Sequence, residues 1–257
     1  MYDQFASDYD HFVNWKNRLS GELPFIEKNL NQLKGANSNT IKLLDAATGT
    51  GMHAIALAKE GFEVAGADLS TEMINIARRN AQDAGVNVRF EAVGFGSLVA
   101  TFSGQSFDAL LCLGNSLPHL LNENDLKKAI SDFATCLRPG GWLLIQNRNF
   151  DEVMGRQDRW MEPQTFSEGD TQWVFERFYD FNADGSIQFN VVSLKRQGQE
   201  AWSSRVFSTT LRPILRDELV KLLQEQGFTS IRTLGSLSEE VFNPESSSNL
   251  VISAIKG

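Results

Sequence analysis

From Ile41 onwards, short apolar runs alternate with amphipathic helical stripes, and this alternation strongly limits the folds open to the chain. Strands that alternate with helices form βαβ units, which require a parallel sheet with right-handed crossovers. The clearest helical stripe begins at Leu126 and ends before Pro139. The predicted strands are residues 41–45, 63–68, 86–91, 107–113 and 142–146, followed by two more at 229–234 and 249–255. The chain is therefore predicted to have an α/β fold.

Two segments depart from this alternation. Residues 1–35 are predicted to be helical, with Pro24 either kinking the helix or beginning a second one. Between residues 151 and 212 the pattern predicts no helix but three β-type runs, at 172–181, 186–196 and 201–211. A turn-forming Ala-Asp-Gly-Ser segment separates the first two runs. The expected organisation is one α/β domain over 1–150 and 213–257, with a helical cap over 1–35. Residues 151–212 are expected to form an antiparallel β insertion, a candidate lid.

Composition excludes several classes of protein. The formal net charge is −8, from 24 Lys+Arg and 32 Asp+Glu, and the chain has no basic stripe, which disfavours nucleic-acid binding. No apolar run approaches the roughly 18–20 residues that span a bilayer, and no secretory signal is recognisable. Two distant cysteines favour a reducing compartment, and the spacing of the three histidines disfavours a metal site. We expect a cytoplasmic protein with a small-molecule substrate, and homo-oligomerisation stays open.

The glycine loop Asp45–Gly51 lies between the first strand and the next helix. Such glycines bring backbone N–H groups and a helix N-terminus close to a ligand. Asp68 ends the second strand, where a carboxylate can accept hydrogen bonds from ribose hydroxyls. Because Ala54 completes a G-x-G-x-x-A pattern, a dinucleotide cofactor is an alternative. Asp45 argues against it, since this acid suits a cationic or hydroxyl-bearing ligand better than pyrophosphate.

The loop also resembles the D-x-[AG]-x-G-x-G loop of class I S-adenosylmethionine-dependent methyltransferases. Further similar segments are Asp68–Met73, Phe107-Asp108 and Leu137–Gly141. The resemblance implies a doubly wound, mostly parallel seven-stranded sheet whose last strand is antiparallel. It also implies cofactor contacts from Asp45, Ala47, Thr48, Gly49, Gly51, Asp68, Leu69, Met73, Phe95 and Leu113. Gly94 stands where many methyltransferases have an acid that binds adenine, so Phe95 and apolar neighbours are expected to contact the base.

A narrower resemblance concerns the acceptor. Cys112–Leu120 resembles the L-G-N-S-x-x-H-L segment of glycine N-methyltransferases, and Asn147–Asp151 resembles their H-R-N-Y-D segment. It implies that Asn115 and Arg148 hold the acceptor's carboxylate, a role for which a guanidinium fork is well suited. Alternatively, Arg148 forms a surface ion pair with a nearby acid and Asn115 is only a turn residue. The remaining acceptor candidates are Tyr2 and Tyr9, which are expected to orient the amine, and Arg212, a second carboxylate contact.

These features together predict an S-adenosylmethionine-dependent N-methyltransferase. Its acceptor would be the amine of a small carboxylate-bearing metabolite, with glycine or sarcosine as first choice and no metal involved. One alternative is a small-molecule methyltransferase with a different acceptor, such as an amino sugar, a larger amine or a carboxylic acid. The glycine loop is also compatible with an NAD-dependent oxidoreductase or with a non-catalytic cofactor-binding module.

Overall fold

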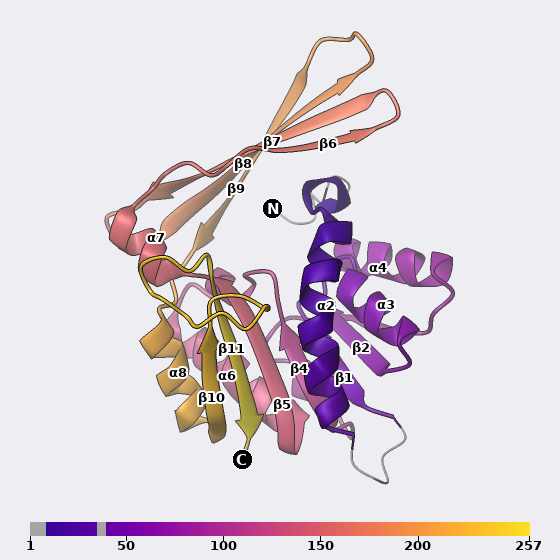
Figure 1. The fold of residues 1–257 in the computed structure, drawn as a ribbon, viewed down its shortest axis with the longest axis vertical. Coiled ribbons are helices and arrows are strands. Elements are labelled where there is room, and N and C mark those ends of the chain that lie inside the picture. Colours follow the sequence, from indigo (N-terminus) through magenta and orange to yellow (C-terminus); the bar gives the residue numbers. More distant parts are fainter. Residues whose placement is uncertain (1–8, 35–39) are drawn as a thin grey trace.

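The computed structural model describes residues 9–34 and 40–257. Its main feature is a seven-stranded sheet in the order β10-β11-β5-β4-β1-β2-β3 (Figure 1). The strands are β1 (Lys42–Ala46), β2 (Glu63–Asp68), β3 (Arg89–Ala92), β4 (Phe107–Cys112), β5 (Leu137–Arg148), β10 (Phe228–Leu234) and β11 (Asn249–Lys256). Neighbours from β5 to β3 pair in parallel, whereas β11 is antiparallel to both β5 and β10. The predicted α/β class with an antiparallel last strand is confirmed.

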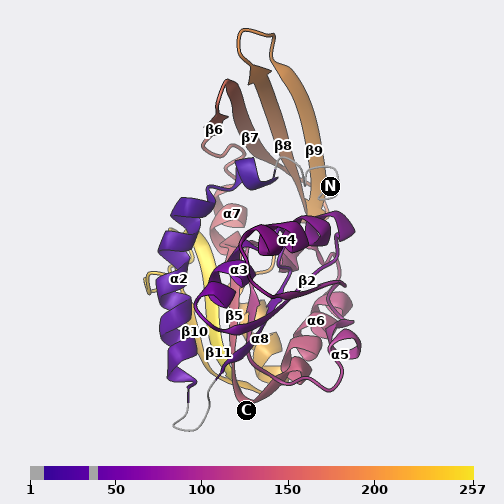
Figure 2. The same ribbon diagram turned by 90° about the vertical axis from the view of Figure 1, so that its right-hand side faces the viewer.

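Helices cover both faces of this sheet. One face carries α2 (Trp15–Gln32), α3 (Met52–Lys59) and α4 (Thr71–Asp83), whose apolar residues pack on Leu43, Leu111 and Leu144. The other face carries α5 (Leu98–Thr101), α6 (Glu123–Cys136) and α8 (Arg216–Glu225), which pack on alternate residues such as Leu44 and Leu110. Figures 1 and 2 show the two layers. Because both faces are covered, the central strands are apolar throughout, which explains the continuous apolar runs in the sequence.

A second sheet has four antiparallel strands in the order β6-β7-β8-β9 and projects from the carboxyl edge of the first sheet (Figures 1 and 2). Its strands are β6 (Gln164–Glu168), β7 (Thr171–Phe181), β8 (Ile187–Gln197) and β9 (Ser203–Leu211). Tyr179 and Leu211 pack near its base on Phe150, which belongs to the main body. The N-terminal Tyr9 and Phe12 pack on a second cluster, around Phe175. The N-terminal segment and the projecting sheet therefore enclose the carboxyl edge of the main sheet together.

The structure corrects three local predictions. Residues 150–156 form a helix, α7 (Phe150–Arg156), where none was predicted, because the Asn149 side chain caps it by accepting hydrogen bonds from the N–H groups of Asp151 and Glu152. Strand β6 was also missed. Pro24 lies inside the single helix α2 and does not begin a second one. The burial of Phe25, Ile26 and Leu30 against the sheet outweighs the hydrogen bond that proline removes.

Gly51 has a positive φ of 81° at the start of α3, and its missing side chain is required for packing. A Cβ atom there would lie 2.8 Å from Phe90 Cζ and 2.9 Å from Ala77 Cβ. We expect Gly51→Ala to lose about 1–3 kcal/mol of unfolding free energy by overpacking, beyond the ~1–2 kcal/mol cost of a left-handed alanine. Gly61→Ala is the matched control, because Gly61 has φ +86° with nothing within 4 Å. Urea unfolding measures both variants, and equal losses would contradict the prediction.

Candidate active site

A first cavity of about 270 Å³ lies at the carboxyl ends of β1, β2 and β4. Gly49, in the loop after β1, has a positive φ of 57° and donates its N–H to Asp68 Oδ2 at 2.9 Å. The N–H of Ser70 donates to Asp68 Oδ1, also at 2.9 Å. Backbone amides therefore orient both oxygens of this carboxylate. A carboxylate oxygen can accept more than one hydrogen bond. The two oxygens of Asp68 are therefore suited to accept from both hydroxyl groups of a vicinal diol, such as that of a ribose.

Asp45 lies deeper in the same cavity and is almost completely buried. Thr48 Oγ1 donates a hydrogen bond of 2.7 Å to Asp45 Oδ2. Burial raises the pKa of Asp45, against the opposing effects of His53, Thr48 and Arg18. A buried carboxylate that lacks a direct cationic partner among the described side chains gains most from a ligand that brings positive charge.

The opposite end of the first cavity is apolar. Leu69, Met73 and Phe95 line it, and Phe95 packs edge-on against Phe133 with ring centroids 5.4 Å apart. A Cβ atom on Gly94 would lie 3.0 Å from Leu69 Cδ1, so glycine leaves the wall open beside the leucine. A flat aromatic base suits such a surface, and Asp68 and Asp45 line the same cavity.

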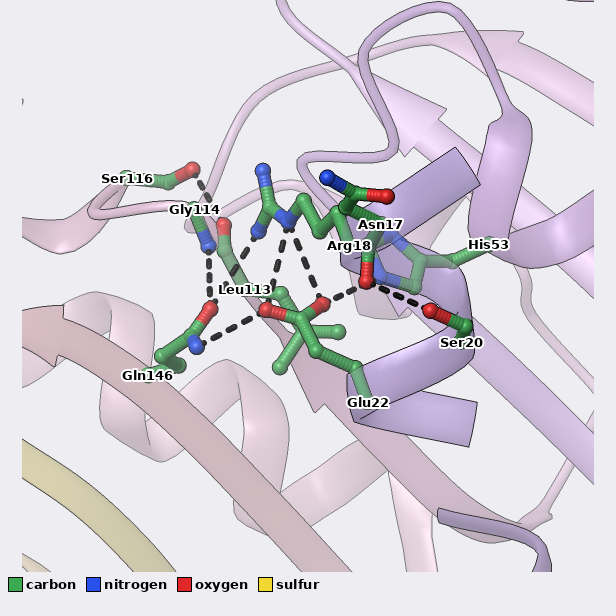
Figure 3. Close-up of polar contacts among 9 residues, drawn as sticks. All are labelled: Asn17, Arg18, Ser20, Glu22, His53, Leu113, Gly114, Ser116 and Gln146. Carbon is green, nitrogen blue, oxygen red and sulfur yellow. Dashed lines mark hydrogen bonds and ion pairs between the residues drawn. The ribbon is translucent and has the colours of Figure 1, made fainter. Parts of the chain in front are cut away.

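A polar network on α2 forms the wall shared with a second cavity (Figure 3). Arg18 Nε donates to both oxygens of Glu22 at 3.2 Å, and Arg18 Nη2 donates to Gln146 Oε1 at 3.2 Å. Gln146 Nε2 donates to Glu22 Oε1 at 3.0 Å. On its other side Glu22 contacts His53 Nε2 at 2.6 Å. The network fixes a guanidinium beside Gly114, at the boundary of the two cavities.

The second cavity, of about 340 Å³, lies between the end of β5 and the projecting sheet. Tyr9, Arg18, Gly114 and His119 line both cavities, so the two adjoin. Arg148 ends β5 and faces the second cavity, and its Nε is buried with no hydrogen-bond partner among the described residues. The side-chain Oδ1 and Nδ2 atoms of Asn147, which also lines this cavity, are likewise buried without a hydrogen-bond partner among the described residues. Asn115 adopts a positive φ of 66°, and its Oδ1 accepts a 2.9 Å hydrogen bond from the Arg148 N–H.

The structure places most of the predicted site residues around these cavities. The first cavity is lined by Asp45, Ala47, Thr48, Gly49, Asp68, Leu69, Met73, Phe95 and Leu113, and the second by Asn115 and Arg148, with Tyr9 lining both. Gly51 and Arg212 line neither cavity: Gly51 packs against Phe90, and Arg212 pairs with Glu218. Tyr2 lies outside the described residues.

Four residues of the polar network were not predicted from the sequence: Arg18, Glu22, His53 and Gln146. The first two lie on the N-terminal helix, whose position over the sheet no local pattern could give. Arg18 does follow Trp15, and its guanidinium lies 5.3 Å from that ring's centroid, but this spacing alone would not mark a site. Within residues 9–34 and 40–257, no group of three or more metal-binding side chains is suitably placed, and no helix is long and apolar enough to cross a membrane. Both cysteines, Cys112 and Cys136, are free and buried, as expected.

A parallel sheet with a glycine loop after β1, an acid that backbone amides orient at the end of β2 and an adjoining polar cavity is typical of nucleoside-cofactor enzymes of the doubly wound class. Residues 43–141 match a family model described as a methyltransferase domain. The chain is 31% identical to a glycine/sarcosine N-methyltransferase of Halorhodospira halochloris, over 91% of this chain and 80% of the relative. It is 32% identical to the enzyme of the same name from Aphanothece halophytica, over 91% and 82%. The chain therefore belongs to the glycine/sarcosine N-methyltransferase family.

Solved structures agree on the fold. An S-adenosylmethionine-dependent methyltransferase from Clostridium acetobutylicum superposes with a TM-score of 0.78 at 18% identity, covering 100% of this chain and 99% of that one. A SAM-bound amino pentose methyltransferase from Micromonospora echinaspora gives 0.73 at 17% identity, covering 98% and 96%. Because the relatives of 31% and 32% identity are N-methyltransferases and residues 43–141 match a methyltransferase domain, the protein is an S-adenosylmethionine-dependent methyltransferase, not an NAD-dependent oxidoreductase.

The first cavity fits this cofactor. Asp68 matches the ribose diol, and the apolar end around Leu69 and Phe95 matches adenine. The methionine part of the cofactor carries an ammonium, a sulfonium and a carboxylate. Asp45 would provide negative charge for the two cationic groups, and Arg18 would provide positive charge for the carboxylate.

Proposed function

We propose that the protein transfers a methyl group from S-adenosylmethionine to the amine of a small carboxylate-bearing acceptor such as glycine or sarcosine. One observation carries the proposal: Arg148 directs a half-buried guanidinium, whose buried Nε has no hydrogen-bond partner among the described residues, into a cavity that adjoins the cofactor cavity. A buried cation without an acid is costly, and a bound carboxylate would offset that cost with paired hydrogen bonds. The names of the relatives, glycine/sarcosine N-methyltransferase, support the same acceptor class.

When bound, the cofactor supplies a methyl group that its sulfonium already activates, so the protein's task is mainly to position the acceptor. In the proposed arrangement Arg148 binds the carboxylate. Asn115 holds the backbone of Arg148 through its Oδ1, which leaves its Nδ2 to donate a second hydrogen bond. Gly114 and Tyr9 lie where the two cavities meet, so they are placed to orient the amine.

The acceptor must present a neutral amine, because only the lone pair on nitrogen can accept the methyl group. His119 lines both cavities, and burial lowers its pKa to about 4. It is therefore uncharged at neutral pH and adds no positive charge beside the amine. Removing the amine proton costs about 1.4 kcal/mol for each pKa unit above the working pH, so activity is expected to rise towards alkaline pH.

An acceptor panel tests this proposal. Release of S-adenosylhomocysteine is measured with glycine, sarcosine, dimethylglycine, methylamine and an amino sugar, each at equal concentration. We expect glycine or sarcosine to be methylated at least about tenfold more efficiently than methylamine, which lacks the carboxylate, because a hydrogen bond to a charged group contributes about 1.5–3 kcal/mol. Turnover of the amino sugar alone, or equal turnover of methylamine and glycine, would contradict the proposed acceptor class.

A further inference from the structure

The second cavity contains another arginine, which the sequence did not single out. Arg177 lies in the middle of β7, and its guanidinium carbon is 5.6 Å from the centroid of the Phe12 ring. Arg177 Nη2 donates to the backbone oxygen of Glu162 at 3.1 Å. Its Nε is buried with no hydrogen-bond partner within the described part of the chain. Arg177 on the projecting sheet thus resembles Arg148 on the main sheet: both line the second cavity, and both have a buried Nε without a described hydrogen-bond partner.

No described carboxylate pairs with either arginine. The acidic residue that lines this cavity is Glu22, and it is already bound by Arg18, His53 and Gln146. Burial lowers the pKa of Arg177, and the positive charge of Arg148 adds to that effect, against the opposing effects of Tyr179 and Glu176. The two guanidinium groups therefore face the same cavity and repel each other, and Glu176, the acid next to Arg177 in the sequence, does not line that cavity. An anionic ligand between them would relieve both the repulsion and the cost of burial.

We propose that Arg177 is a second carboxylate-binding residue of the acceptor cavity, so that the acceptor's carboxylate is held between Arg148 on the main sheet and Arg177 on the projecting sheet. This inference rests on the proposed function and deepens it. It makes the four-stranded sheet a determinant of acceptor choice, since an amine without a carboxylate would gain nothing from Arg177. It also means that the bound acceptor joins the two sheets through charge-assisted hydrogen bonds.

Arg196 provides a matched control for the test. It lies on β8 of the same sheet, its guanidinium stacks on an aromatic ring (Trp202, 4.7 Å), and its Nη2 donates to a single oxygen (Gln172 Oε1). Its Nε is likewise buried without a partner among the described residues. Arg196 differs from Arg177 in that it lines neither cavity. Loss of either arginine should therefore perturb the sheet similarly, but only Arg177 should affect the acceptor.

The experiment compares Arg177→Gln, Arg177→Lys and Arg196→Gln in the full chain. Acetate serves as a carboxylate-only probe, measured as a competitive inhibitor against glycine or sarcosine. We expect Arg177→Gln to raise both the acceptor KM and the acetate inhibition constant about tenfold, with kcat changed less than about twofold and cofactor affinity unchanged. Arg177→Lys should recover part of the loss, because it restores the charge without the fork. Arg196→Gln should match the parent enzyme.

Two outcomes would overturn the assignment of Arg177. One is an acetate constant that Arg177→Gln leaves unchanged. The second is a rise in KM that is equally large for methylamine, which would indicate a merely structural role. If the proposed acceptor class were wrong, the result would be different. The parent enzyme itself would methylate no carboxylate-bearing amine, and acetate would not compete with the acceptor that the enzyme does use.

Discussion

Replacing Arg148 by alanine is expected to lower kcat/KM for the carboxylate-bearing acceptor by roughly 30-fold or more. The guanidinium is half-buried at the end of β5, and truncating one partner of a buried, hydrogen-bonded charge pair costs about 2–5 kcal/mol. Most of the loss should appear as a raised KM, because the carboxylate stays bound throughout the reaction and its anchor therefore binds ground state and transition state alike. Steady-state kinetics with a saturating cofactor concentration would measure it.

Two variants show whether the effect belongs to the guanidinium of Arg148. Arg148→Lys keeps the charge but loses the bidentate fork, so it should fall between the alanine variant and the parent. Arg156→Ala removes an exposed arginine of α7 that pairs with Glu152 and Asp158, and it should leave KM unchanged. If Arg148→Ala keeps the parent's KM, the carboxylate is bound elsewhere and the proposed anchor is wrong.

The elements of the fold that could be predicted are those that local residue preferences and hydrophobic periodicity determine. Strand β2 was predicted at its observed bounds, Glu63–Asp68. The hairpin between β7 and β8 was also expected, because its turn residues have local preferences. Strand β6 was missed, since four of the five residues in its short run, Gln164–Glu168, are polar, and it becomes a strand only by pairing with β7.

The polar residues that line the first cavity could be predicted, because they come from one continuous loop and one strand end, and each of these has a short sequence motif. The polar network between the two cavities could not be predicted, because its residues are far apart in the sequence. Arg18 and Gln146 are 128 positions apart in the sequence, and they meet because α2 crosses the main sheet beside β5. Arg177 reaches the second cavity only because β7 projects over it. Contacts of this kind depend on tertiary packing, which no local spacing encodes.

Glu22 is the second residue whose change should have a large effect, in this case on stability. Its side chain is 13% exposed, and burial by itself would raise its pKa. Hydrogen bonds and charges from His53 and Arg18, with a further hydrogen bond from Gln146, outweigh burial and lower the pKa of Glu22 from 4.5 to about 2. The folded state therefore prefers the ionised carboxylate more strongly than the unfolded chain does.

The sign of the pH dependence follows from that preference. Above about pH 4.5 the carboxyl is ionised in both states, and its contribution to stability is complete. As the pH falls from about 4.5 to about 2, the unfolded chain takes up the proton first and the contribution is lost. One pKa unit corresponds to about 1.4 kcal/mol, so the loss is on the order of 3 kcal/mol. Denaturant unfolding at a series of pH values should show this loss in the parent and not in Glu22→Gln.

Several carboxylates besides Glu22 titrate over the same range, so the informative quantity is the difference between parent and variant at each pH. That difference should shrink by about 3 kcal/mol between pH 5 and pH 2 for Glu22→Gln. For Glu225→Gln it should change little, because Glu225 forms an exposed pair with Lys221 at 3.9 Å. A constant difference for Glu22→Gln would mean that the network does not favour the ionised carboxylate. Arg18 would then have no fixed anionic partner, and the wall between the two cavities would depend on packing alone.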